Sequence, residues 1–420
     1  MCIFLINIFM KIVADLHIHS RFARACSPRL TIEEITRWAK IKGVQIIGTG
    51  DFTHPLWFKE LSNNLEEAEK GLYVLKTQTE IRFILQAEVS LIYSKNGKTR
   101  KIHYLVLASN LKFAGEINRE LTKAGAKLGS DGRPIIGMTS ERLAEIVFGI
   151  SPDCMIIPAH AWTPWFGIFG SKGGFNSIEE CFGKWSNKIY AIETGLSSDP
   201  KMNWTVKELD NIALISNSDA HSPEKIMREA NVFEFDKLNY KNIIEAIKNK
   251  KILYTIEFFP EEGKYHWDGH RDCNVSMSPE KSNKVKGICF KCGRPFVIGV
   301  KNRVNALSSR ILDEKHKNSI PFKHLIPLNE IIAQAIGVGY NAKSVWSIYH
   351  SIVSKIGTEI KVLEDASFKE LKTVTEEDIA KTIVNARNGN VEIIPGYDGV
   401  FGKIKVIINN KEKQKDLFSV

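Results

Sequence analysis

The sequence has few cysteines and lacks an apolar run long enough to cross a membrane. Seven cysteines among 420 residues, an odd number, argue against the disulfide framework of a small secreted protein. The apolar stretch 2–10 is too short to span a bilayer, and it has neither the basic start nor the small-residue cleavage site of a signal peptide. We therefore interpret residues 1–10 as an N-terminal extension and expect a cytoplasmic protein without a membrane partner.

Acidic residues are also scarce relative to basic ones. The chain has 58 Lys and Arg against 48 Asp and Glu, a formal net charge of +10. This balance favours a polyanionic partner such as nucleic acid or acidic lipid, although surplus lysine can serve solvation alone. The length allows two or three domains with a sizeable core.

Short β-branched runs alternate with amphipathic helical patterns from residue 12 to about 257. Thr31 and Glu34 have capping-box spacing at the start of the first helical pattern, and Gly43 follows its end. The pattern predicts parallel βα units, in a barrel or an open sheet. Seven strands are expected, at 12–14, 44–48, 83–87, 102–108, 155–158, 190–192 and 213–216.

Candidate metal ligands follow these runs. His17 and His19 are two residues apart, so on a strand both imidazoles point to the same side. Every other candidate except His103 also stands at the end of a run, where loops converge over the mouth of a (β/α) barrel. His103 lies inside its run and can still point inward. The predicted metal ligands are His17, His19, Asp51, Glu88, His103, His160, Asp219 and His221, with His54 as an additional candidate.

A second metal site is predicted after residue 263. A His-x2-Cys pair and a Cys-x2-Cys-Gly pair have the spacing of two zinc knuckles. Such a site has no open coordination position, so the zinc should stabilise the fold. The predicted ligands are His270, Cys273, Cys289 and Cys292, with His266 as the rival fourth ligand. Helical patterns at 328–336, 344–356 and 377–387 follow.

The first metal set resembles that of the PHP (polymerase and histidinol phosphatase) family. The resemblance covers about the first 255 residues and implies a distorted seven-stranded barrel whose two or three metal ions hydrolyse phosphoesters. Two departures stand out. The usual Thr-Asp-His of the second motif is Gly50-Asp51-Phe52 here, and residues 21–26 hold no counterpart of a later histidine of the first motif.

The residue types point to the same chemistry. Mixed histidine and carboxylate sites suit Mg, Mn or Zn ions, and a carboxylate such as Glu88 can bridge two of them. Such ions activate water and clamp phosphoryl oxygens. Glu193 and Asp199 follow the sixth run and are our candidate catalytic residues. Asp199 can orient the water or the leaving oxygen, or it can simply cap a helix.

The whole region 11–405 resembles the endonuclease Q family. The matching motifs are 48–51, 158–165, 193–197, 216–223, the zinc module, 324–328 and 330–333. The resemblance implies a nucleoid-associated, Mg-supported DNA repair enzyme that cuts 5′ to deaminated bases (hypoxanthine, uracil, xanthine) and abasic sites. The nick would carry a 3′-hydroxyl and a 5′-phosphate.

An enzyme that extracts a damaged base needs an apolar pocket and a basic track. We expect the loop after His160 to supply the pocket and the zinc module to supply the track. The alternative is that the aromatic residues pack the barrel rim and that the basic residues are solvated. The candidate DNA contacts are Trp162, Trp165, Phe166, Ser171, Lys172, Arg271, Arg294 and Arg303.

The C-terminal stretch 414–420 partly resembles a sliding-clamp-binding motif, through Gln414, Leu417 and Phe418. It lacks the terminal aromatic pair, and a frayed tail is the alternative.

The expected organisation is α/β, with a distorted (β/α)7 PHP barrel, a zinc-ribbon module and an α-helical C-terminal domain. Two other functions remain open: a PHP phosphatase on a small phosphomonoester, and a non-catalytic nucleic-acid-binding subunit of a repair complex. The expected boundaries are 1–10 for the extension, 11–257 for the PHP domain, 258–305 for the zinc module, 306–405 for the helical domain and 406–420 for a flexible tail.

Overall fold

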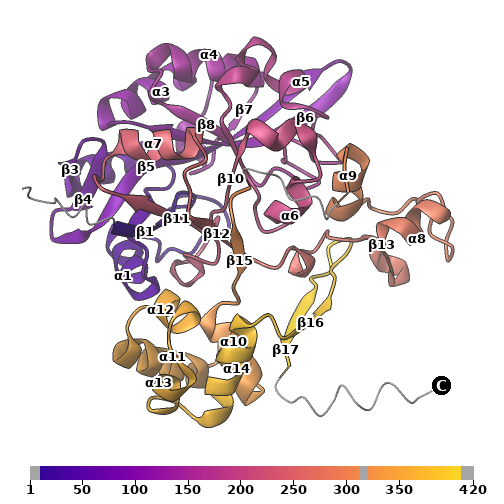
Figure 1. The fold of residues 1–420 in the computed structure, drawn as a ribbon. Coiled ribbons are helices and arrows are strands. Elements are labelled where there is room, and N and C mark those ends of the chain that lie inside the picture. Colours follow the sequence, from indigo (N-terminus) through magenta and orange to yellow (C-terminus); the bar gives the residue numbers. More distant parts are fainter. Residues whose placement is uncertain (1–9, 312–318, 408–420) are drawn as a thin grey trace, which may run out of the picture.

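The computed structural model of the chain describes residues 10–311 and 319–407. It shows a mixed α/β body whose strands are surrounded by helices, with a bundle of C-terminal helices packed below the body (Figure 1). The predicted clamp-binding residues Gln414, Leu417 and Phe418 lie outside the described residues. Across the described residues, every helix is too short or too polar to cross a membrane.

All seven predicted strands are confirmed. They are β1 (Met10–Asp15), β2 (Ile46–Gly48), β5 (Gln78–Lys95), β6 (Lys98–Ala108), β8 (Met155–Pro158), β9 (Ala191–Glu193) and β10 (Ala213–Ile215). The other strands of the body are β3 (Leu65–Glu69), β4 (Leu72–Leu75), β7 (Ile135–Ile136), β11 (Ala230–Phe235), β12 (Tyr254–Glu257) and β15 (Phe322–His324).

The prediction of parallel βα units is right for part of the sheet and wrong for the rest. β1, β2 and β5 are parallel neighbours, and β9 pairs in parallel with β10. β6 instead runs antiparallel to both β5 and β8, and β11 runs antiparallel to β1. For β5 and β6 the reason is a two-residue turn at Asn96 (φ 54°) and Gly97 (φ 70°), which joins them as a hairpin.

Helices cover the sheet on its outer sides (Figure 1). The helix predicted between Thr31 and Gly43 is confirmed as α1 (Ile32–Lys42); the Thr31 side chain caps it, and Gly43 ends it in the left-handed conformation. The other helices of the body are α2 (Pro55–Asn64), α3 (Leu111–Lys123), α4 (Ser140–Ile150), α5 (Ile178–Phe182), α6 (Pro200–Asn203) and α7 (Tyr240–Lys248).

The predicted zinc module forms a small unit beside the body, and the three predicted C-terminal helices are confirmed as α10, α11 and α14. The elements of the module are β13 (Asp268–His270), β14 (Val275–Met277), α8 (Pro279–Lys284) and α9 (Val300–Leu307). Those of the C-terminal region are α10 (Leu328–Ile336), α11 (Lys343–Ile356), α12 (Glu359–Glu364), α13 (Phe368–Lys372), α14 (Glu377–Arg387), β16 (Val391–Ile394) and β17 (Lys403–Val406).

A buried ion pair joins the C-terminal helices to the body. Lys42 Nζ at the end of α1 lies 2.6 Å from Glu359 Oε2 at the start of α12, and both side chains are almost fully buried. Glu359 also accepts hydrogen bonds from the Leu328 amide (3.1 Å) and from the Tyr349 hydroxyl. The carboxylate therefore ties three C-terminal helices to one helix of the body.

Replacing Glu359 by Ala should lower the free energy of unfolding by about 3–5 kcal/mol, because it leaves the Lys42 charge buried without a partner. The double variant Lys42→Met/Glu359→Leu should lose less, since an apolar pair carries no desolvation cost. Chemical denaturation measures both. Glu145→Ala is the control, because the Arg142–Glu145 pair is exposed and should contribute less than about 1 kcal/mol. Equal losses for Glu359→Ala and the control would contradict the role of the buried pair.

Candidate metal centre

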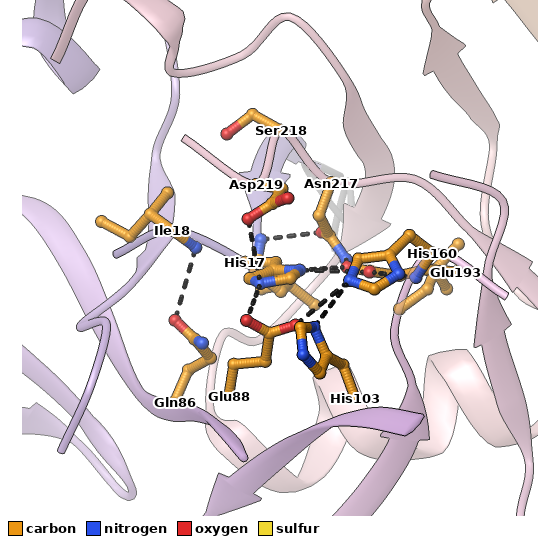
Figure 2. Close-up of polar contacts among 12 residues, drawn as sticks. His17, Ile18, Gln86, Glu88, His103, His160, Glu193, Asn217, Ser218 and Asp219 are labelled. Carbon is orange, nitrogen blue, oxygen red and sulfur yellow. Dashed lines mark hydrogen bonds and ion pairs between the residues drawn. The ribbon is translucent and has the colours of Figure 1, made fainter. Parts of the chain in front are cut away.

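The two histidines after β1 point to the same place. His19 Nε2 lies 3.1 Å from Asp219 Oδ1 and 3.3 Å from Glu88 Oε2. His17 Nε2 lies 3.5 Å and 3.8 Å from the same two oxygens (Figure 2). The strand spacing of the pair therefore brings two imidazole nitrogens and two carboxylate oxygens together, and these ligand atoms all lie within 4.8 Å of one another.

A carboxylate behind each imidazole fixes its orientation. His17 Nδ1 lies 3.0 Å from Glu193 Oε1, and His19 Nδ1 lies 2.9 Å from Asp51 Oδ1. Because an ionised carboxylate only accepts hydrogen bonds, each Nδ1 must donate, which leaves each Nε2 as the nitrogen that can ligate a cation in the centre. His17 Nε2 is buried and has no hydrogen-bond partner among the described residues. A cation between these atoms would satisfy it.

Asp51 therefore has a different position from the one predicted. Instead of lying in the ligand group, its carboxylate is behind His19 and accepts hydrogen bonds from the Ser20 amide (2.6 Å) and hydroxyl (2.7 Å). Glu193 is similarly placed behind His17, where it also accepts hydrogen bonds from the His160 amide (2.9 Å) and from Asn217 Nδ2 (2.8 Å). Both acids orient ligand residues.

A second ligand group shares Glu88 with the first. Glu88 Oε1 lies 2.8 Å from His103 Nδ1 and 3.2 Å from His160 Nε2, while Oε2 faces His17 and His19 (Figure 2). A carboxylate with one oxygen in each group is the geometry of a bridge between two metal ions. The Thr163 hydroxyl lies 2.9 Å from His160 Nδ1, so this imidazole is also fixed on its far side.

The electrostatics of the cluster favour a bound cation. Burial lowers the pKa of His17, but the charges of Glu193 and Asp219 outweigh it and raise that pKa well above its usual value. Burial raises the pKa of Glu88, whereas His103 and Arg133 hold it well below its usual value. The acids thus attract positive charge to a buried set of nitrogen and oxygen ligands. Divalent cations such as Mg, Mn or Zn fit such a donor set and would displace the imidazole protons.

The backbone is strained at three of these residues. Asp51 (φ 43°), His160 (φ 31°) and Asp219 (φ 47°) all have positive φ angles, which L-residues other than glycine seldom adopt. Such conformations cost about 1–3 kcal/mol each and persist where the surrounding structure imposes them. Their concentration at the ends of β2, β8 and β10 supports a functional constraint.

Besides Asp51 and Glu193, three predicted active-site residues lie outside both ligand groups. The His221 ring stands 4.7 Å from that of His19, and its Nδ1 donates to the Asp219 carbonyl (2.8 Å). His54 stacks on Phe22 at 4.4 Å and is buried. Asp199 accepts a hydrogen bond from the Met202 amide (2.8 Å) and so caps α6. The capping role considered for Asp199 is therefore present, and its catalytic role stays a prediction.

Arg133 was missed by the sequence analysis. Its guanidinium donates to Glu88 Oε2 at 3.0 Å from a loop between α3 and α4. The sequence around it shows no motif that points to this contact, because tertiary packing alone brings the loop to the centre. Asn217 was also missed, although it stands within a motif that the analysis quoted.

An aromatic cavity of about 370 Å³ opens beside the centre. His103, His160 and Asp219 form part of its lining, and Trp165, Phe166, Tyr265 and Phe401 are its aromatic residues. The rings of Trp165 and Tyr265 meet edge to face at 5.1 Å. Phe401 is 68% exposed. Tyr265 and Phe401 come from segments far along the chain, and the sequence analysis assigned them no role.

The structure separates the predicted DNA contacts. Trp162 is buried and donates its indole N–H to Asn203 (2.7 Å), so its prediction as a DNA contact is wrong: it belongs to the core. Arg303 donates to the carbonyls of Phe169 (2.8 Å) and Phe175 (3.0 Å), so its guanidinium holds the loop after β8. The exposed candidates are Trp165, Lys172, Arg271 and Arg294, while Phe166 and Ser171 are partly buried.

The four predicted zinc ligands lie together. The ligand atoms of His270, Cys273, Cys289 and Cys292 are all within 4.8 Å of one another, and His270 Nδ1 is 3.6 Å from Cys292 Sγ. His266, the predicted rival, is buried outside this group. Three thiols and one imidazole suit a tetrahedral zinc ion.

Metal analysis of the dialysed protein should give at least two ions at the shared centre and one zinc per chain, as the ligand groups among the described residues indicate. Glu88→Gln should lower the number of metal ions bound at the centre, because it removes a ligand charge from both groups. Cys289→Ser should remove only the zinc. Glu80→Gln, at an exposed carboxylate, is the control. An unchanged metal content in Glu88→Gln would contradict the bridging role.

Three comparisons place the chain among known proteins. Residues 327–390 match the profile of the family described as MJ0043 C-terminal domain. The uncharacterized protein MJ0043 of Methanocaldococcus jannaschii is 36% identical over 252 residues, but the match spans only 31% of that protein and 58% of this chain. The uncharacterized protein YqxK of Bacillus subtilis is 29% identical over 417 residues, which covers 94% of this chain and 99% of YqxK.

Two crystal structures match almost the whole fold. The lesion-specific endonuclease PfuEndoQ of Pyrococcus furiosus superposes with a TM-score of 0.84 and 32% identity, covering 98% of this chain and 100% of that chain. An endonuclease Q complex with a 27-mer duplex that has an abasic lesion at the active site gives a TM-score of 0.84, 31% identity and the same coverage. The chain therefore belongs to the endonuclease Q family, a family of endonucleases.

Proposed function

We propose that this protein is a metal-dependent DNA repair endonuclease that hydrolyses the phosphodiester 5′ to a damaged nucleotide. The substrates would be deaminated bases (hypoxanthine, uracil, xanthine) and abasic sites, and the products a 3′-hydroxyl and a 5′-phosphate. The observation that carries the proposal is the position of Glu88, which contributes one oxygen to each of two ligand groups beside an aromatic cavity. The relative solved with an abasic duplex supports the substrate class.

The centre would hold two or three divalent ions. When bound, such ions lower the pKa of a coordinated water and neutralise charge on the phosphoryl oxygens. His17, His19 and Asp219 would hold one ion, and His103 with His160 another, with Glu88 between them. Glu193 and Asp51 would keep the His17 and His19 imidazoles in the tautomer that ligates. A protein nucleophile is not required, because an activated water can attack phosphorus directly.

The cavity supports recognition of an extruded nucleotide. A base can stack on aromatic faces once it leaves the duplex, and Trp165, Tyr265 and Phe401 offer such faces next to the ligands. Lys264 Nζ lies 5.7 Å from the ring centres of both Tyr265 and Phe401, so a cation accompanies these rings. A nucleotide held here would place its 5′ phosphate toward the metal centre.

A basic groove lies beside residues 170–176 of the loop that follows β8. Its volume is about 740 Å³, and its lining includes Lys98, Arg100, Lys172 and Arg303. We interpret it, together with the exposed Arg271 and Arg294, as a track for the DNA backbone.

The finer architecture is part of the proposal. We assign the body to a distorted (β/α)7 PHP barrel, the unit at 258–305 to a zinc ribbon with one structural Zn, and residues 306–405 to a helical domain. The two alternative functions are less well supported. A phosphatase for small phosphomonoesters has no use for a 740 Å³ basic groove, and a non-catalytic subunit has no use for a complete ligand set.

Wild-type protein with Mg should nick duplexes that contain one deoxyinosine, deoxyuridine or abasic site and leave an undamaged duplex intact. His19→Ala should lower the nicking rate by more than about 100-fold, because losing a ligand costs more than losing an outer-shell partner. Denaturing electrophoresis of labelled duplexes measures both. The control is His350→Ala, at an exposed histidine on α11.

Each outcome separates the hypotheses. Equal cutting of the undamaged duplex would contradict lesion specificity, and an active His19→Ala would contradict the metal site. Rapid hydrolysis of p-nitrophenyl phosphate without nicking would favour the phosphatase.

Trp165→Ala and Phe401→Ala should weaken binding of a deoxyinosine duplex by about 5- to 150-fold, since stacking of one base contributes about 1–3 kcal/mol. The loss should be smaller for an abasic duplex, which has no base to stack. Fluorescence anisotropy without Mg measures both. Phe290→Ala, at an aromatic residue that is 65% exposed and outside the cavity, is the control. Equal losses for both duplexes would show that these rings do not stack on the base.

A further inference from the structure

We infer that Arg133 is a catalytic residue that binds the non-bridging oxygens of the scissile phosphate. The inference rests on the proposed function, because it assigns a role in hydrolysis of a phosphodiester at the Glu88 centre. The Arg133 guanidinium donates to Glu88 Oε2 at 3.0 Å, the oxygen that also faces His17 and His19. A phosphate held at the shared carboxylate would therefore lie within reach of this guanidinium.

The loop that carries Arg133 is held rigidly. The Asp131 carboxylate accepts hydrogen bonds from the amides of Arg24 and Arg133, each at 3.1 Å. The Gly132 amide donates to the Phe22 carbonyl (2.9 Å), and its own carbonyl accepts from Thr53 (3.1 Å). A Cβ on Gly132 would lie 2.5 Å from Asp51 Oδ2, so only glycine allows this close approach. The guanidinium is therefore positioned before any substrate binds.

The guanidinium also has donors to spare. Arginine has five N–H donors, and among the described residues Glu88 is its one hydrogen-bonding side-chain partner. The Arg133 side chain is 25% exposed, whereas Glu88 is fully buried, so Arg133 is the member of the pair that solvent and substrate can reach. Forked N–H groups match phosphate oxygens, and a fixed cation is most effective where negative charge develops during reaction.

A simpler role for Arg133 would be to balance the buried charge of Glu88. The two roles predict different effects on metal affinity and nicking rate when the Arg133 guanidinium is removed. A charge balancer competes with divalent ions, so its loss should tighten metal binding and leave the reaction intact. Loss of a phosphate-binding residue should instead weaken substrate binding and slow nicking, whether or not the metal affinity changes.

The test combines Arg133→Met with a substrate that lacks one phosphate charge. Duplexes with one abasic site carry either a normal phosphate or a methylphosphonate at the scissile position. Their binding to full-length protein is measured by anisotropy without Mg, and no chelator is added, so that the structural zinc stays in place. Methylphosphonate should weaken binding to the wild type by about tenfold, because it removes the charge that pairs with the guanidinium. It should weaken binding to Arg133→Met by less than about twofold, because the variant has no guanidinium for that charge to pair with. With Mg, Arg133→Met should reduce the single-turnover nicking rate of the normal duplex by about 100-fold or more.

Arg24→Met is the matched control, because its side chain is 77% exposed and contacts the same Asp131. It should behave as wild type in both assays. Arg133→Lys keeps the charge but not the fork, so it should retain the methylphosphonate effect while nicking more slowly. Melting curves and Mn²⁺ titrations establish that the variants are folded and bind metal.

Three results would overturn the inference. They are an equal methylphosphonate effect in wild type and Arg133→Met, a nicking rate of Arg133→Met equal to that of wild type, and tighter Mn²⁺ binding by Arg133→Met with full activity. All three leave the proposed function intact if the wild type nicks damaged duplexes. Absence of nicking by the wild type would instead contradict the proposed function itself.

Discussion

The centre depends on a single buried carboxylate, that of Glu88. A carboxylate removed from water costs several kcal/mol unless charge and hydrogen bonds compensate it. Here the compensation comes from separate parts of the chain: His17 and His19 after β1, His103 on β6, His160 after β8 and Arg133 from a loop. The same charge that makes the carboxylate costly to bury attracts cations to the centre. Folding and metal binding are therefore linked through one side chain.

The hairpin of β5 and β6 explains how Glu88 meets these partners. Glu88 lies in the middle of a long strand, directly opposite Leu105 on β6, and His103 lies two positions before Leu105 on that strand. An all-parallel barrel would place every ligand at a strand end. The antiparallel pair instead brings His103 to Glu88 from within a strand, which accounts for the exception noticed in the sequence.

The sequence predicted the parts of the site that depend on local geometry. The proximity of His17 and His19 could be predicted because strand alternation fixes their common side, and that of His270, Cys273, Cys289 and Cys292 because knuckle spacing is short. Asp51 could not be told apart from a direct ligand, since a carboxylate at a strand end can face the centre or lie behind an imidazole. That choice depends on Ser20, whose amide and hydroxyl hold one Asp51 oxygen away from the centre. Arg133 and Tyr265 were beyond prediction, because only tertiary packing brings their segments to the site.

The cavity is a composite of segments, and this bears on the size of the substrate. Phe401 comes from the loop between β16 and β17, which is bound to residues 261–267 by four backbone hydrogen bonds. These bonds are Gly396 N–H to Glu261 O, Trp267 N–H to Gly396 O, Gly399 N–H to Lys264 O and Gly402 N–H to Glu262 O. The C-terminal region is in turn joined to α1 through Lys42 and Glu359. The loop between β16 and β17, near the C-terminal end of the chain, thus lines the cavity of the body and connects it with the C-terminal helices. Such a construction would suit the DNA substrate that we propose, because contacts with all of these units would fix which nucleotide reaches the cavity.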